Sequence, residues 1–223
     1  AYSDHLVDVF NKVMNWCADA AGGKSTRSLY LFSQPGPWGS GCGNGKTMLM
    51  WMAFKWLTRH GSSIYEGAAK QSLDNLAYYS IEPLGFVCNL KSGLCDPFLR
   101  AKCSFKDMDL SKYSKLMDGL GGQVELASID DLAEGVLGAM PYLFLDDVGR
   151  DRPGDMVIGL YEKLLDLRAT NLLPTFMTSN YSPENVGRRI GAPAASRLIR
   201  VNCEVVEVKA QDFSLVKNRL EPV

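Results

Sequence analysis

The stretch of residues 39–47, Gly-Ser-Gly-Cys-Gly-Asn-Gly-Lys-Thr, constrains the fold more than any other part of this 223-residue sequence. Its four glycines carry no Cβ, so the backbone can wrap an anion with consecutive N–H groups pointing inward. Lys46 adds a positive charge, and Thr47 supplies a hydroxyl of the kind that binds Mg²⁺ at the start of a helix. The pattern predicts a phosphate-binding loop between a strand and a helix. It departs from G-x-x-x-x-G-K-[ST] at Ser40, which stands where the first glycine is expected.

The flanks of this stretch agree with that prediction. Residues 28–33 are a short apolar run typical of a buried strand, and residues 47–60 are predicted to be helical. This second segment has almost no polar face, so we expect other elements to wrap it. An amphipathic helix is predicted earlier, over residues 6–17. The expected contacts to the phosphates of a nucleotide are Ser40, Gly41, Cys42, Gly43, Asn44, Gly45, Lys46, Thr47 and Met48.

A second apolar strand, beginning at residue 142, ends abruptly in two carboxylates, Asp146 and Asp147. In a parallel sheet the ligand lies at the carboxyl ends of the strands, so both acids are expected beside the phosphates. We expect Asp146 to hold Mg²⁺, directly or through water, together with Thr47. Asp147 is expected to orient and polarise the attacking water. The pair at residues 130–131 is a rival, but Glu125 interrupts the strand that precedes it.

A third segment completes the expected architecture. Residues 156–172 are predicted to form a helix, and the strand at residues 174–180 ends in Asn180, which can reach the γ-phosphate or its water. The alternation of strands and helices predicts an α/β fold, a P-loop NTPase three-layer sandwich with a mostly parallel sheet. A last strand over residues 204–208 and a short terminal helix leave no room for a full C-terminal lid domain.

Length and composition bound the remaining possibilities. We expect one domain over residues 1–223, with an irregular insertion at about residues 62–122. A net charge of −1 and a pI near 6.2 argue against binding nucleic acid by bulk charge, and leave room only for a local basic stripe. No apolar run reaches the ~18 residues of a membrane span. The first residue is Ala1, which suggests a trimmed N-terminus rather than a signal peptide.

The six cysteines are expected to stay thiols, because a phosphate loop favours a reducing, cytoplasmic location. Three of them, Cys88, Cys95 and Cys103, fall in the insertion without a C-x-x-C pair. A zinc site there would need a distant fourth ligand, so zinc is not the expected metal.

The order of the motifs resembles the AAA-plus ATPases of the DnaC/IstB type, which are bacterial and phage helicase loaders and transposition ATPases. The motifs that carry the resemblance are G-x-G-K-T at residues 43–47, L-D-D-V-G at 145–149, P-T-x-x-T-S-N at 174–180, and S-R-L at 196–198 followed by V-V-E-V at 205–208. The resemblance implies that Asp146 and Asp147 are the Walker B acids. It also implies that Asn180 is sensor 1 and that Arg197 is an arginine finger inserted into a neighbouring subunit.

The function implied by the resemblance is a Mg²⁺-dependent ATPase that acts in DNA replication as a helicase loader. Such a protein would assemble into a ring or helical oligomer and bind single-stranded DNA, a replicative helicase or both. Asp147 stands where the wider superfamily usually has Glu, one methylene longer, which bears on the hydrolysis rate. The alternatives are a transposition-type ATPase regulator, a viral superfamily 3 helicase, a P-loop small-molecule kinase, and an ATP-dependent adaptor that hardly hydrolyses. A GTPase is disfavoured because no NKxD guanine motif follows the loop.

Overall fold

The computed structural model describes residues 2–22, 24, 27–37, 41–60, 87–88, 142–150, 153–200 and 202–211. Within them, five strands form one sheet in the order β2-β3-β4-β1-β5, and every neighbouring pair is parallel. The strands are β1 (Ser28–Phe32), β2 (Val87–Cys88), β3 (Leu143–Val148), β4 (Thr175–Ser179) and β5 (Cys203–Glu207). The predicted α/β class with a parallel sheet is confirmed.

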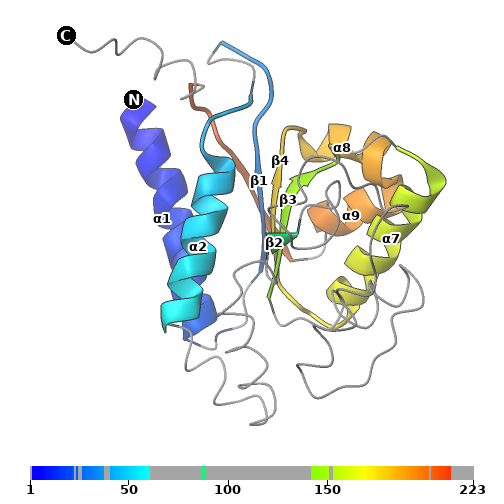
Figure 1. The fold of residues 1–223 in the computed structure, drawn as a ribbon, viewed down its shortest axis with the longest axis horizontal. Coiled ribbons are helices and arrows are strands. Elements are labelled where there is room, and N and C mark those ends of the chain that lie inside the picture. The colour runs from blue at the N-terminus through cyan, green and yellow to red at the C-terminus, as the bar shows by residue number, and fades with distance from the viewer. Residues whose placement is uncertain are drawn as a thin grey trace.

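Helices cover both faces of this sheet (Figure 1). One face carries α1 (Tyr2–Ala21) and α2 (Lys46–His60), and the other carries α7 (Asp155–Thr170), α8 (Pro183–Ile190) and α9 (Ala192–Arg200). The result is the three-layer sandwich that the alternating pattern predicts.

The motifs meet where the strands end, at the side of the sheet formed by the carboxyl ends of its strands, which we call its carboxyl edge. Strand β4 lies between β1 and β3, with Leu31 opposite Thr178 and Leu145 opposite Met177. Because all the strands run in the same direction, the loop after β1 and the acids of β3 lie at the same edge as Asn180. Strand β5 pairs with β1 on the side opposite β4. The loop after β1 therefore lies between the end of β4 and the end of β5.

The core between the sheet and the first two helices is aromatic. Trp16 of α1 packs edge-on against Phe144 and Phe176, with ring centroids 6.1 and 5.4 Å away. Each such pair contributes about 0.5–1.5 kcal/mol beyond its buried area. Val9, Val13 and other apolar positions of α1 are buried, which confirms the predicted amphipathic helix.

The expectation that α2 is wrapped by other elements is wrong. Met50, Phe54 and Leu57 are buried, but Met48 is 68% exposed and Met52 is 40% exposed. Among the described elements, α2 packs against α1 and against β3 and β4 of the sheet, and it buries the sides that face them. The apolar residues of α2 extend beyond that buried stripe.

Several expectations fall outside the described residues. These are the insertion at residues 62–122 apart from β2, the rival acid pair at residues 130–131 with the strand that precedes it, and the terminal helix after residue 211. Cys95 and Cys103 belong to the same group, as does the side chain of Cys88. Among the described helices, none combines the length and apolar character that crossing a membrane requires.

Candidate functional site

The loop after β1 is shaped by glycines with left-handed backbone angles. Gly41 has φ 77°, Gly43 has φ 65° and Gly45 has φ 90°, a region that other residues adopt only with strain. A Cβ on Gly41 would also lie 2.9 Å from the carbonyl carbon of Gln34, closer than real Cβ contacts come. The chain therefore turns here as a phosphate loop must, and α2 begins directly after it at Lys46. Ser40 lies outside the described residues.

Lys46 lies inside this loop. Its Nζ donates to the carbonyl oxygen of Gly41 and to Oδ1 of Asn44, both at 2.9 Å, and to the hydroxyl of Ser33. Only 5% of the residue is exposed. The ammonium group is thus held by neutral acceptors that phosphate oxygens can replace.

The pKa of Lys46 is shifted by its burial and, in the opposite direction, by neighbouring side chains. Burial lowers its pKa to about 8, while Cys42, Asp147 and Asp146 act in the opposite direction. These interactions place the lysine in the same electrostatic neighbourhood as both acids of β3.

Asp146 joins the loop to the sheet. Its Oδ1 accepts a hydrogen bond of 2.9 Å from the hydroxyl of Thr47 and another of 2.5 Å from the hydroxyl of Thr178 in β4. Hydroxyl and carboxylate oxygens are the hard ligands that Mg²⁺ prefers, and the ion usually takes only one or two protein carboxylates besides phosphate and water. The oxygen atoms of Thr47 and Asp146 therefore fit a Mg²⁺ ion, and the metal-binding role of the two residues stays a prediction. No cluster of three or more His, Cys, Asp or Glu side chains suited to a metal occurs in the described part of the chain.

Asp147 is held in a different way. Its backbone is left-handed, with φ 57°, and its N–H donates to Thr178 Oγ1 at 3.0 Å. Its Oδ2 accepts a hydrogen bond of 2.6 Å from Nη1 of Arg150, which the sequence analysis did not single out. The signal was present in residues 147–150, Asp-Val-Gly-Arg, because glycine at the third position of a turn brings the first and fourth residues together. Gly149 indeed has φ 80°.

The two remaining predicted residues lie in different places. Asn180 directly follows β4, between the ends of β1 and β3, so the structure brings it to the edge that carries the loop and the acids. Arg197 in α9 instead pairs with Asp166 of α7 at 2.5 Å. It lines a small cavity with Ser28 and Thr175, which begin β1 and β4, so it lies toward the opposite edge of the sheet.

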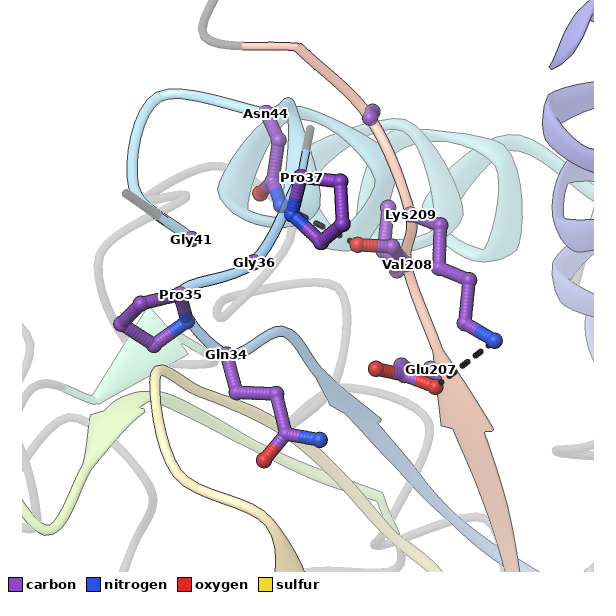
Figure 2. Close-up of a pocket in the computed structure, with 10 residues that line it drawn as sticks. Gln34, Pro35, Gly36, Pro37, Gly41, Asn44, Glu207, Val208 and Lys209 are labelled. Atoms are coloured by element: carbon purple, nitrogen blue, oxygen red, sulfur yellow. Dashed lines mark hydrogen bonds and ion pairs between the residues drawn. The ribbon is translucent and has the colours of Figure 1, made fainter. Parts of the chain in front are cut away.

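A cavity that the sequence analysis missed lies on the other side of the loop (Figure 2). Its volume is about 230 Å³, and its lining comes from residues 34–37, from Gly41 and Asn44, and from residues 207–210, which run from the last residue of β5 onward. In Figure 2, Gln34 comes from the segment that follows β1, and Glu207 lies at the end of β5. No single segment of sequence reveals this cavity, because its walls come from distant parts of the chain.

Three contacts fix the segment after β5 in this cavity wall. The side-chain amide of Asn44 donates to the carbonyl oxygen of Val208 at 3.2 Å, and Glu207 pairs with Lys209 at 3.2 Å. The backbone N–H of Lys209 donates to Nε2 of His5, near the start of α1, at 3.1 Å. The wall is therefore tied both to the phosphate loop and to the first helix.

A parallel sheet with a glycine-turned loop after β1, a Thr–Asp oxygen pair and a polar-ended strand between them has the architecture of a P-loop nucleoside-triphosphatase fold. No protein-family model matches the sequence, and no curated protein matches it either. Similar solved structures include a DNA replication initiation factor, the DnaC helicase loader and DnaI. A DNA replication initiation factor has a TM-score of 0.54 at 13% identity, over 97% of this chain and 51% of that one. The DnaC helicase loader has 0.49 at 19% identity, over 89% and 86%, and DnaI has 0.46 at 17%, over 88% and 83%.

At these identities the similarity concerns the fold. This chain spans about half the length of the replication initiation factor. The AAA-plus resemblance inferred from the motifs is thus confirmed for the architecture, and the chemistry is argued from the residues themselves.

Proposed function

We propose that the protein binds ATP with Mg²⁺ and hydrolyses it to ADP and phosphate. The observation that carries this proposal is the 2.9 Å hydrogen bond from Thr47 Oγ1 to Asp146 Oδ1, which joins two motifs 99 residues apart. A hydroxyl at the start of a helix and a carboxylate at the end of a strand are the oxygen pair that a nucleotide-bound Mg²⁺ requires. When bound there, the ion would neutralise charge on the phosphates.

The roles of the other side chains follow from their positions at the same edge. The backbone N–H groups of residues 41–47 and the ammonium of Lys46 would bind the phosphates, with Met48 in the next position of the helix. Asp147 would orient the attacking water, and Asn180 would contact the γ-phosphate or that water. Asp147 is one methylene shorter than Glu, so we propose a slow ATPase.

We place the nucleoside in the cavity beside β5. The acids lie on the β3 side of the loop, so a triphosphate whose γ-phosphate faces them directs its other end toward β5. There Glu207, with its side chain 30% exposed, can only accept hydrogen bonds while ionised. Ribose hydroxyls are donors that carboxylates at nucleotide sites commonly bind. We therefore propose that Glu207 recognises the ribose.

We further propose that the chain acts in DNA replication as a helicase loader that binds single-stranded DNA, a replicative helicase or both. The support is the motif resemblance to the DnaC/IstB group, together with a fold shared with a replication initiation factor. In this proposal residues 1–223 form a single AAA-plus domain, and the segment at about 62–122 is an insertion.

Arg197 is proposed to act on a neighbouring subunit in a ring or helical oligomer. It lies near the amino ends of the strands and pairs with Asp166, so it is not part of its own subunit's phosphate site. A guanidinium supplied in trans can increase hydrolysis by about 10³-fold or more. Its release from Asp166 would accompany assembly.

The decisive experiment measures ATP hydrolysis and particle mass with and without single-stranded DNA, for the wild type and for Lys46→Ala. We expect Lys46-dependent hydrolysis and a larger mass when ATP and DNA are both present. Hydrolysis that is equal in the two proteins would contradict the ATPase assignment.

The trans role of Arg197 has its own test. Arg197→Ala subunits and Asp147→Asn subunits, each inactive alone, should recover activity when mixed, because some interfaces then combine an intact acid with an intact finger. If the two variants co-assemble and no activity returns, Arg197 does not act in trans.

A further inference from the structure

We propose that Arg150 senses the γ-phosphate in its own subunit: it holds Asp147 when no γ-phosphate is bound and moves to the γ-phosphate when ATP binds. This inference rests on the proposed ATP site. It adds a residue that neither the motifs nor the comparisons assign, and it explains how the acid is restrained between turnovers.

The local geometry makes Arg150 a built-in partner of Asp147. The backbone N–H of Arg150 donates to the carbonyl oxygen of Asp147 at 3.0 Å, which closes a four-residue turn. Gly149 occupies the third position with φ 80°, and a Cβ there would lie 3.0 Å from Cγ2 of Val186 in α8. The turn is therefore fixed by both its backbone angles and its packing, and it directs the guanidinium back to the carboxylate at 2.6 Å.

Hydrogen bonds connect the turn of Arg150 to the proposed phosphate site: the backbone N–H of Asp147 donates to Thr178 Oγ1 at 3.0 Å, and the hydroxyl of Thr178 donates to Asp146 Oδ1 at 2.5 Å. The hydrogen bond to Asp147 and the charge of that carboxylate raise the pKa of Arg150 most, and Asp146 and Cys42 act in the same direction. The same three side chains act on the pKa of Lys46. Arg150 and Lys46 thus face a common set of groups, one cation coming from the turn after β3 and the other from the loop.

The ion pair can open at little cost. The side chain of Arg150 is 55% exposed, whereas that of Asp147 is 18% exposed, so the arginine is the partner that is free to move. Solvent can hydrate the guanidinium when it leaves, so this pair contributes less to stability than one in which both partners are buried. A γ-phosphate offers several charged oxygens to the planar guanidinium fork, and it is a stronger partner than one carboxylate.

The exchange has a functional consequence. While Arg150 occupies Oδ2 of Asp147, that oxygen is not available to orient a water molecule. ATP removes the arginine and leaves the acid ready, whereas ADP has no γ-phosphate and leaves the pair closed. Arg150 therefore couples the state of the nucleotide to the state of Asp147.

The test compares wild type, Arg150→Gln and Arg150→Lys by equilibrium titration with ADP and with a non-hydrolysable ATP analogue, in parallel with steady-state hydrolysis. Arg150→Gln should bind the analogue about tenfold more weakly, since it loses a charged hydrogen bond, while its ADP affinity changes less than about twofold. Its hydrolysis should fall by about 10²-fold. Arg150→Lys should recover part of the affinity, and it should recover less of the hydrolysis because it lacks the fork.

Arg27→Gln is the matched control, because Arg27 precedes β1 at the other edge of the sheet and should leave both readouts unchanged. Equal losses for ADP and the analogue in Arg150→Gln would overturn the proposal, as would faster hydrolysis at unchanged affinity, which would identify a simple restraint. If the wild type binds neither nucleotide and Lys46→Ala changes nothing, the ATP site itself fails. That outcome is distinct from a failure of Arg150 alone.

Discussion

The two sides of the phosphate loop differ in how their polar groups are arranged. On the β3 side, the hydroxyls of Thr47 and Thr178 converge on one oxygen of Asp146, and Ser179 Oγ donates to the carbonyl oxygen of Val148 at 2.7 Å. On the β5 side there is a cavity of about 230 Å³, bordered by one ion pair and by a loop with two prolines. The first side fixes oxygen atoms in place, and the second leaves space for a ligand.

This difference is the one expected between a region for chemistry and a region for binding. Hydrolysis depends on groups held within fractions of an ångström, so its side chains are locked by hydrogen bonds. Recognition of a nucleoside needs volume and a few directional groups. Mutations on the β3 side should therefore change turnover, and mutations on the β5 side should change affinity and selectivity.

The largest expected effect is that of Asp147→Asn, which should reduce turnover by about 10²–10⁴-fold while ATP still binds, because the amide is a poor base for water. The companion variant Asp146→Asn should instead weaken the Mg²⁺-dependent part of binding. Steady-state hydrolysis and ATP titration with and without Mg²⁺ distinguish them. If both variants hydrolyse ATP at the wild-type rate, the β3 side is not the catalytic one.

Lys46 lies in the loop between the β3 side and the β5 side, and the second-largest effect is expected for Lys46→Ala. We expect ATP affinity to fall on the order of 100-fold, since a charged hydrogen bond to the phosphates is lost. The fold should persist, because Lys46 contacts the loop rather than the core. Titration with ATP and circular dichroism measure the two outcomes, and unchanged affinity would contradict the assignment of the loop.

Glu207→Gln should separate affinity from turnover. We expect ATP to bind about tenfold more weakly and 2′-deoxy-ATP to bind as before, while turnover at saturating ATP is unchanged. Glu204→Gln is the control, since Glu204 belongs to the same strand and pairs with Lys12 at 3.5 Å rather than lining the cavity. Equal affinities of the wild type for ATP and its 2′-deoxy form would remove the ribose from this site.

The smallest effect concerns the link between the two sides. Asn44→Ala removes hydrogen bonds to Val208 and Lys46 and should lower the free energy of unfolding by about 1–2 kcal/mol. Cys42→Ser, at an exposed position of the same loop, should change it by less than about 0.5 kcal/mol. Denaturant titration tests this, and an Asn44→Ala protein as stable as the wild type would mean that the two sides are not coupled through this residue.

The sequence predicted the β3 side better than the β5 side for a physical reason. Asp146 and Asp147 end an apolar strand, and the rule that ligands lie at the carboxyl ends of parallel strands places them without coordinates. Glu207 ends a strand as well, but its place beside the loop depends on β5 lying next to β1, which a strand pattern alone does not reveal.

The sequence also failed to predict the contact of Arg150 with Asp147 and the exposure of Met48 and Met52. Predicting that Arg150 contacts Asp147 would have required recognising that residues 147–150 form a turn, which brings the first and fourth residues together. Hydrophobic periodicity could not predict the exposure of Met48 and Met52, because it describes only the helix itself and not the elements that pack against it. The roles of Lys46, Asp146, Asp147, Asn180 and Arg197 all remain predictions, although their positions are now known.

The wall formed by residues 207–210 is bonded to His5 of α1 at one point and to Asn44 of the loop at another. A partner that displaced the start of α1 would therefore strain the support of Lys46, and a nucleotide that drew Lys46 and Asn44 toward its phosphates would be felt at α1. Thermodynamic linkage makes these two influences equal in free energy. Binding of a partner at the start of α1 and binding of a nucleotide at the loop would therefore change each other's affinity through residues 207–210.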